Sequence, residues 1–352
     1  GAALRAWGPK AEPARLHILT PAAEEARRLW ALSGPRTIGN PFARDLVVAP
    51  ANRLTPRDFV ERLRALSAHG LKVGVRGRKR LARAGSGALS AVGRAAASGP
   101  FLVTLRWPGA GRPVALVGKG LCFDTGGISI KAAAGMEMMR ADMAGAAACA
   151  GAMLALALGR APQAAVAVLA IAENSTGADS YRPGDVLRSL SGRTIEVIDT
   201  DAEGRLVLAD ALHHAVVAHR PTAVVDVATL TGSIVTALGH HHAGLFGNDV
   251  SLRDSLMAAG LAVGEPLWPM PIGERHRQDL RSDIADLRQC LHGRQPDACH
   301  AAAFLREFVG ETAWAHLDIA GVELAEDDMP LAARGMPTGF AARLLAALIR
   351  GR

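Results

Sequence analysis

The sequence predicts an α/β fold with a mostly parallel central sheet and helices on both faces, preceded by a short helical/α-β N-terminal segment. Three observations predict it. From about residue 99, short apolar runs alternate with helical stretches, as in repeated strand–helix units. The run Ala164–Ile171 is continuously apolar, as expected for a strand covered on both faces. The 352 residues are 49% hydrophobic, which provides for a large core.

Residues 1–98 are expected to form a truncated N-terminal segment with linker helices. A helical patch lies around Ala22–Leu32, and a further helix starts near residue 39. The signal for the next helix is Thr55-Pro-Arg-Asp58, in which threonine is the N-cap, proline the first helical residue and aspartate the third. Leu71–Val75 alternates like a strand.

The larger domain is expected to begin after the break Ser98-Gly99-Pro100 and to run over residues 99–352. Its predicted strands are 101–105, 114–117, 164–171, 194–197, 223–227 and 315–319. Its predicted helices are 136–158, 206–218, 301–309 and 337–348. The longest apolar stretch, Met143–Leu158, is short for a membrane span, so we expect a buried helix and no membrane association.

Composition limits the partners and the compartment. The net charge of +7 fits either a nucleic-acid partner or arginine spread over the surface, and we expect the second. The densest basic run, Arg76–Arg83, is expected to be a solvated turn and helix start. Aromatic residues make up 4%, which argues against a stacking platform for single-stranded nucleic acid. The four cysteines form no CxxC pair, so we expect free thiols and the cytoplasm, with an organellar matrix as the alternative because the first 15 residues contain arginine and alanine.

Four polar segments interrupt apolar surroundings at strand ends, where open α/β sheets place their sites. They are residues 117–127, 128–131, 140–145 and 199–205, and their charged candidates are Lys119, Asp124, Lys131, Asp142, Asp199, Asp201, Glu203 and Arg205. Each alone has a structural explanation, such as an acid that favours a helix N-terminus or the wet face of a turn.

Together these segments predict a metal-dependent hydrolase. Only five of the 40 basic residues are lysine, yet Lys119 and Lys131 lie among acids twelve residues apart. Lysine can lose its proton and bind a metal, whereas arginine cannot. Converging carboxylates repel one another and need cations. Carboxylates with one nitrogen donor fit two divalent ions, Zn²⁺, Mn²⁺ or Mg²⁺, which can activate a bridging water.

At these residues the sequence resembles the leucyl aminopeptidase (cytosol aminopeptidase) family over about residues 39–350. The matching stretches are VGKGLCFDTGGISIK (117–131), RADMAGAA (140–147), DTDAEGRLVLADAL (199–212), VATLTG (227–232), ALGHHHAGLF (237–246) and WAHLDIAG (314–321), with weaker similarity in ARDLVVAPANRLTP (43–56). The resemblance implies a metallo-aminopeptidase that removes N-terminal residues from peptides, preferably leucine or other apolar ones. It makes residues 99–352 the catalytic domain of a two-metal peptidase.

The resemblance also implies a role for each site residue. The metal ligands would be Lys119, Asp124, Asp142, Asp201 and Glu203, with Asp124 and Glu203 bridging the two ions. Lys131 would polarise the scissile carbonyl, and Arg205 would hold a bicarbonate that accepts a proton. Met139, Thr229 and Leu230 would line the pocket for the first side chain, with helix core as the alternative for Met139.

The chain departs from the family pattern in several places. Asp199 stands where asparagine is usual, Ala144 replaces a glycine and is expected to crowd a close helix contact, and Ala132 follows Lys131 where proline is usual. Only about 38 residues precede Gly39, so we expect most of the N-terminal domain of the family to be missing or replaced. A homohexamer built around the catalytic domains is still the expected assembly.

Two alternatives stay open at this point. The adjacent His240, His241 and His242 could bind a metal, although successive side chains diverge. A catalytically impaired structural or DNA-binding scaffold of the same family is the second alternative. The presence of every predicted site residue argues against it.

Overall fold

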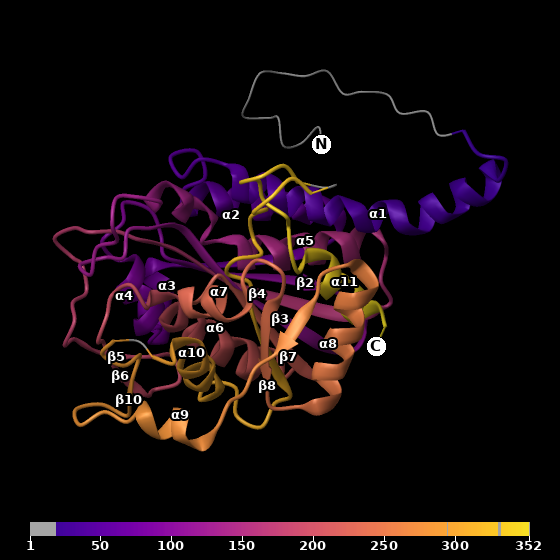
Figure 1. Ribbon diagram of the computed structural model, residues 1–352. Helices are drawn as coiled ribbons and strands as arrows, with labels where there is room; N and C mark the ends of the chain where they lie inside the picture. The colour runs from indigo at the N-terminus through magenta and orange to yellow at the C-terminus, as the bar shows by residue number, and fades with distance from the viewer. Residues whose placement is uncertain (1–18, 294, 330–331, 352) are drawn as a thin grey trace.

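The computed structural model describes residues 19–351 except 294, 330 and 331. Its centre is a twisted sheet of eight strands (Figure 1). In spatial order they are β1 (Lys72–Gly77), β2 (Phe101–Trp107), β4 (Gln163–Asn174), β3 (Ala110–Asp124), β7 (Ala223–Ala228), β11 (Trp314–Asp318), β8 (Ala243–Gly247) and β9 (Leu267–Pro269). The first 15 residues, on which the organellar alternative depends, lie outside the described part.

The middle of the sheet is parallel and its flanks are antiparallel. Strands β4, β3, β7 and β11 run parallel to one another, β1–β2–β4 pair antiparallel on one side, and β11 pairs antiparallel with β8 on the other. Every residue of β7 is buried, and β3 is buried from Val114 to Cys122. Continuous apolar runs therefore form the central strands, as predicted, and the α/β class is confirmed.

Helices cover both faces of the sheet (Figure 1). One core cluster contains residues of α1 (Ala23–Val48), α2 (Pro56–Arg64), α5 (Ala144–Leu158), α8 (Val250–Val263) and α11 (Ala342–Arg350). The opposite cluster contains residues of α3 (Arg78–Ala84), α4 (Gly87–Gly93), α6 (Glu203–His219), α7 (Gly232–Leu238) and α10 (Asp297–Arg306).

Short elements complete the described part of the chain. A small sheet orders β10 (Leu287–Arg288), β6 (Thr194–Glu196) and β5 (Val186–Arg188). The helix α9 (Glu274–Asp279) and the 3₁₀ helices η2 (Ala65–His69) and η3 (Met136–Ala141) are single turns or little more. The capping box predicted at Thr55 is present, because its hydroxyl accepts from the amide of Asp58 and the Asp58 carboxylate accepts from the amide of Thr55.

The residues before the predicted domain boundary belong to the same sheet and core. Strand β1 pairs with β2 across the boundary at residues 98–100, and α1 packs on α5. The separate helices predicted around residues 22–32 and from residue 39 are one continuous helix, α1. The division into 1–98 and 99–352 stays a prediction.

The predicted helix 136–158 is wrong at its start. It divides at Asp142 and Met143 into η3 and α5. The carbonyl of Asp142 accepts from the amide of Leu121 on β3, which removes it from the helical hydrogen-bond ladder. The stretch Met136–Leu158 is long and apolar enough to cross a membrane, but 94% of its most apolar window is buried inside the fold. As predicted, it is a core helix.

Glycines let α5 lie against the strands β3 and β7. A Cβ built on Gly118 would lie 2.5 Å from the Cα of Ala146, and one on Gly145 would collide with the carbonyl oxygen of Val227. We expected a close helix contact at Ala144, but the close contact is made by the next residue, Gly145, against Val227. Ala144 itself is buried at the first position of α5.

Gly118→Ala is expected to lower the free energy of unfolding by about 1–3 kcal/mol, because backbone must move to admit the methyl group. Chemical denaturation measures this loss. The matched control is Gly232→Ala at the start of α7, where a Cβ meets nothing within 4 Å. Equal stability of the two variants would contradict the tight contact between β3 and α5.

Candidate metal centre and active site

The site lies at the carboxyl ends of the parallel strands. Strand β3 carries Lys119 near its end and finishes at Asp124, and both side chains are almost completely buried. The chain then turns through Gly126 and Gly127, which have φ of +86° and +68°. These values favour glycine. The amide of Lys131 donates to the carbonyl of Thr125 at 2.9 Å, so the turn brings Lys131 back over Asp124.

Two helix starts supply the other carboxylates. Asp142 lies two residues before α5, Asp201 lies two residues before α6, and Glu203 is the first residue of α6. Helix N-termini carry a partial positive charge that favours carboxylates. The fold thus brings together all six predicted lysines and acids, Lys119, Asp124, Lys131, Asp142, Asp201 and Glu203.

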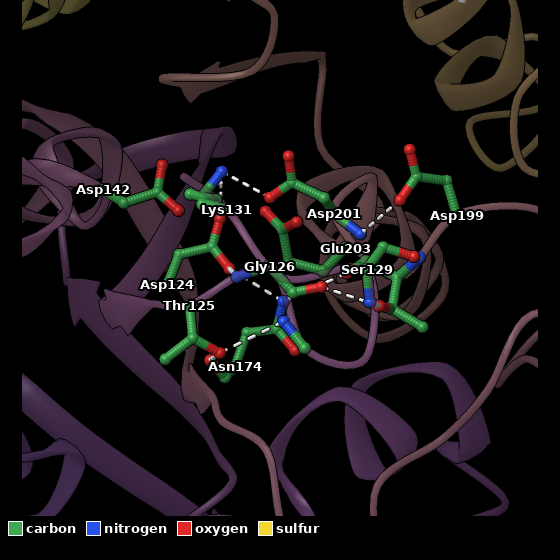
Figure 2. Close-up of polar contacts among 12 residues, drawn as sticks. Asp124, Thr125, Gly126, Ser129, Lys131, Asp142, Asn174, Asp199, Asp201 and Glu203 are labelled. Atoms are coloured by element: carbon green, nitrogen blue, oxygen red, sulfur yellow. Dashed lines mark hydrogen bonds and ion pairs between the residues drawn. The ribbon is translucent and has the colours of Figure 1, made fainter. Parts of the chain in front are cut away.

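The two lysines lie between pairs of these acids. The ammonium Nζ of Lys119 is 2.8 Å from Oδ1 of Asp142 and 3.0 Å from Oε1 of Glu203, and it donates to the carbonyl of Thr229 at 2.8 Å. The Nζ of Lys131 lies 3.0 Å from Oδ2 of Asp124 and also contacts Asp201. Figure 2 shows the amine of Lys131 directed at Asp201, above Asp124.

Burial and mutual repulsion shift the pKa values of the acids. Burial, followed by the charge of Glu203, raises the pKa of Asp124 to about 6. Burial also raises the pKa of Asp142 well above its usual range. Burial alone would raise the pKa of Glu203 as well. The positive charges of Lys119 and Lys131 outweigh the effect of burial, so the pKa of Glu203 is lowered.

The lysines show the reverse balance. Burial alone would lower the pKa values of Lys119 and Lys131, but their carboxylate neighbours outweigh it and raise both. Four carboxylates against two ammonium groups leave the cluster short of positive charge.

The arrangement fits divalent cations. Asp124, Asp201 and Glu203 offer ligand atoms that all lie within 4.8 Å of one another. Oδ2 of Asp142 and Oε2 of Glu203 are buried and have no hydrogen-bond partner among the described residues. An unpaired buried carboxylate oxygen is costly, and a divalent ion with oxygen ligands removes that cost.

Hydrogen bonds from neighbouring strands orient the acids. Nδ2 of Asn174 donates to Oδ1 of Asp124 at 2.7 Å, and the hydroxyl of Thr229 donates to Oδ1 of Asp142 at 2.7 Å. Sequence reasoning missed Asn174. Its signal was its place at the end of the apolar β4, where it pairs with Asp124 of β3.

Arg205 lies on α6 and is 1% exposed. Its Nη1 donates to the carbonyl of Gln289 at 3.0 Å, and its Nη2 is 2.5 Å from Oδ1 of Asp297. Its Nε is buried without a hydrogen-bond partner among the described residues. The anchors Gln289 and Asp297 were also missed, because neither lies in a motif.

Two of the predicted pocket residues, Met139 and Leu230, lie in different settings. Met139 is half-buried in η3 and does not lie in the core. Leu230 follows β7, and its amide donates to Oδ1 of Asp318 at 3.0 Å. A Cβ on Gly204 would lie 2.8 Å from both Leu230 Cδ1 and Lys119 Nζ, so the Leu230 side chain lies near the metal-site lysine.

The unusual Asp199 caps the loop that carries Asp201. Its Oδ1 accepts from the amide of Asp201 at 2.8 Å, and its own amide donates to Oε1 of Gln289. Figure 2 shows its carboxylate at the edge of the cluster.

The three histidines lie on the loop before β8. Nδ1 of His240 is 2.8 Å from the carbonyl oxygen of Gly321, and the ring of His242 packs edge-on against Trp268. Within the described part of the chain, the one group of three metal-ligating side chains is the acidic cluster. His240 and His242 therefore have local structural contacts.

Most of the chain is similar to known proteins of one family. The model of the cytosol aminopeptidase family, catalytic domain, matches residues 41–346. The chain belongs to the cytosol aminopeptidase family. A probable cytosol aminopeptidase of Brucella ovis is 44% identical over 97% of this chain and 69% of its own length. One of Rhizobium etli is 45% identical over the same shares.

A solved structure agrees with this assignment. The bottromycin maturation enzyme BotP in complex with Mn is similar with a TM-score of 0.90 and 38% identity, over 99% of this chain and 77% of that one. The fold and family predicted from the motifs are confirmed, whereas the roles of individual site residues stay predictions.

Mn²⁺ is expected to raise the melting temperature of metal-stripped protein, because a ligand that binds only the folded state stabilises it, by about 2.7 kcal/mol at one hundred times its Kd. Asp142→Asn should reduce this rise. The control Asp254→Asn alters an exposed carboxylate on α8 and should leave the rise unchanged. Thermal unfolding with and without Mn²⁺ measures the rise in melting temperature for the wild type, Asp142→Asn and Asp254→Asn. An undiminished rise in Asp142→Asn would exclude the Asp142 carboxylate as a metal ligand.

Proposed function

We propose that the protein is a metallo-aminopeptidase that hydrolyses the N-terminal residue of peptides, with a preference for leucine and other apolar residues. The observation that carries the proposal is the buried cluster of four carboxylates and two lysines at the sheet edge of a cytosol aminopeptidase family member. The similar BotP structure is a complex with Mn, which supports a divalent metal. The proposed assembly is a homohexamer, and the proposed compartment is the cytoplasm.

Two divalent ions per subunit, Zn²⁺ or Mn²⁺ with Mg²⁺ as a further candidate, are the proposed cofactors. Their proposed ligands are Lys119, Asp124, Asp142, Asp201 and Glu203. When bound, such ions supply Lewis-acid activation of water and of the substrate carbonyl. The unpaired oxygens of Asp142 and Glu203 support this assignment.

Lys131 is the proposed electrophile. Its side chain is 21% exposed, compared with 3% for Lys119, so substrate can reach it. Once cations compensate Asp124 and Asp201, its ammonium group is available to a carbonyl oxygen that gains negative charge. A fixed cation in a water-poor site stabilises such an oxyanion strongly.

Arg205 is proposed to hold the bicarbonate. Its two Nη groups are anchored, and its remaining Nε–H is the donor available to a carbonate oxygen. Met139, Thr229 and Leu230 are proposed to line the pocket for the first side chain. The position of the Leu230 side chain near Lys119 supports its place there.

A leucine chromogenic amide should be cleaved by the metal-loaded protein and not by the metal-stripped one. Lys131→Ala should lower kcat by about a hundredfold or more, the cost of removing one oxyanion donor. It should leave the bound metal content largely intact, because the carboxylates remain. The rate of amide release and the metal content by elemental analysis are the two measurements.

Lys79→Ala is the matched control, since Lys79 is an exposed lysine on α3 and should keep full activity. Normal turnover in Lys131→Ala would remove its assigned role. Silence of the metal-loaded wild type toward every aminoacyl amide would refute the aminopeptidase itself.

A further inference from the structure

A second polar pocket lies away from the carboxylate cluster, at the outer edge of the sheet. It has a volume of about 290 Å³ and is formed by β1, β2, the start of α3 and the end of α6. Its charged or ionisable lining residues are all basic: Lys72, Arg76, Arg80, Arg106, His214 and His219. No described carboxylate lines it, and none forms an ion pair with its four permanent cations.

Strand register forces these cations together. Lys72 and Arg106 are direct partners in the antiparallel pair β1–β2, and Arg76 follows on the same face of β1. Like charges in directly opposite positions destabilise a strand pair. An anion bound between them would offset this repulsion by its attraction to both cations.

The floor of the pocket is a pair of histidines from α6. His214 is only 7% exposed, and no hydrogen bond from a described residue reaches its ring. His219 packs edge-on against it with ring centroids 5.6 Å apart, and its Nε2 is buried without a partner within the described chain. Nε2 of His219 is thus an unused hydrogen-bonding group in a residue that lines the cation-rich pocket.

The surroundings favour an anion over a metal ion. Burial, followed by the charge of Arg76, lowers the pKa of His214 to about 4, and burial with Arg106 lowers that of His219. Four fixed cations would repel a metal ion as they repel the imidazolium proton. The C-terminal end of α6 carries about half a negative charge, which four full positive charges outweigh.

We propose that this pocket binds the polyphosphate group of a small molecule. Lys72 and Arg76 are four residues apart on an extended strand, which separates their backbones by roughly 13 Å. That span exceeds one phosphate and suits a chain of two or three. Arginine recognises phosphate oxygens through paired N–H donors. Among the described residues, no Phe, Tyr or Trp lines the pocket to stack on a base, so the phosphates and not a nucleobase are recognised.

Calorimetric titration of the metal-loaded protein tests the proposal, with Mg²⁺ in excess so that chelation is constant. The probes are inorganic tripolyphosphate, a free source of the group, and ATP, a nucleotide source. Both should bind, with Kd values within a few-fold of each other. The double variant Arg76→Gln/Arg106→Gln should weaken both by about tenfold or more per lost charge-assisted contact. Arg253→Gln, an exposed arginine on α8, is the control and should change neither.

The NMR resonances of the histidine rings give a second measurement. Non-specific attraction of an anion to surface charge would not shift the resonances of these two rings selectively. Tripolyphosphate should shift the ring resonances of His214 and His219 in the wild type and in Arg253→Gln, but not in the double variant. Absence of tripolyphosphate binding to the wild type, or equal weakening in Arg253→Gln, would overturn the proposal. Binding of ATP alone would overturn it too, as would binding of duplex DNA that tripolyphosphate does not displace.

Discussion

The structure depends on placing four carboxylates in a buried site and compensating their charge. Asp124, Asp142, Asp201 and Glu203 meet where β3 ends and where α5 and α6 begin. Without metal, Lys119 and Lys131 compensate part of this charge. Desolvated charges are tolerable only when paired, so the positions of these lysines and of any bound cations are coupled. In the proposed mechanism, bound cations would compensate Asp124 and Asp201 and so make the Lys131 ammonium group available to the substrate carbonyl.

The rest of the fold holds this cluster rigid. Gly118 and Gly145 let α5 approach the sheet closely enough to bring Asp142 to Lys119. Asn174 at the end of β4 and Thr229 directly after β7 fix two of the carboxylates by hydrogen bonds. Hydrogen bonds of this kind hold ligands in one orientation before a metal binds, which strengthens metal sites.

Much of this could be predicted from the sequence because it is local. Apolar runs indicated the central strands, and the lysines and acids stood out at their ends. Asn174, Gln289 and Asp297 could not be predicted, since each acts through contacts made only in the fold. The break before α5 was missed because it depends on a hydrogen bond from Leu121 to Asp142. The basic residues from Arg76 to Arg83 are exposed, as predicted, but the pocket that Arg76 and Arg80 line with Arg106 depends on strand pairing and could not be predicted.

The most direct test of the coupling is a count of the protons released when metal binds. In the metal-free site, carboxylate neighbours raise the pKa of Lys119, so its amine is protonated at about pH 7.5 and must lose a proton to become a ligand. Calorimetric titration with Mn²⁺ in buffers of different ionisation enthalpy gives this count. We expect the wild type to release about one proton more per chain than Lys119→Arg, which keeps a positive charge beside Asp142 and Glu203 but cannot lose its proton. An equal count in both proteins would mean that Lys119 stays an ammonium group, and would contradict its place among the metal ligands.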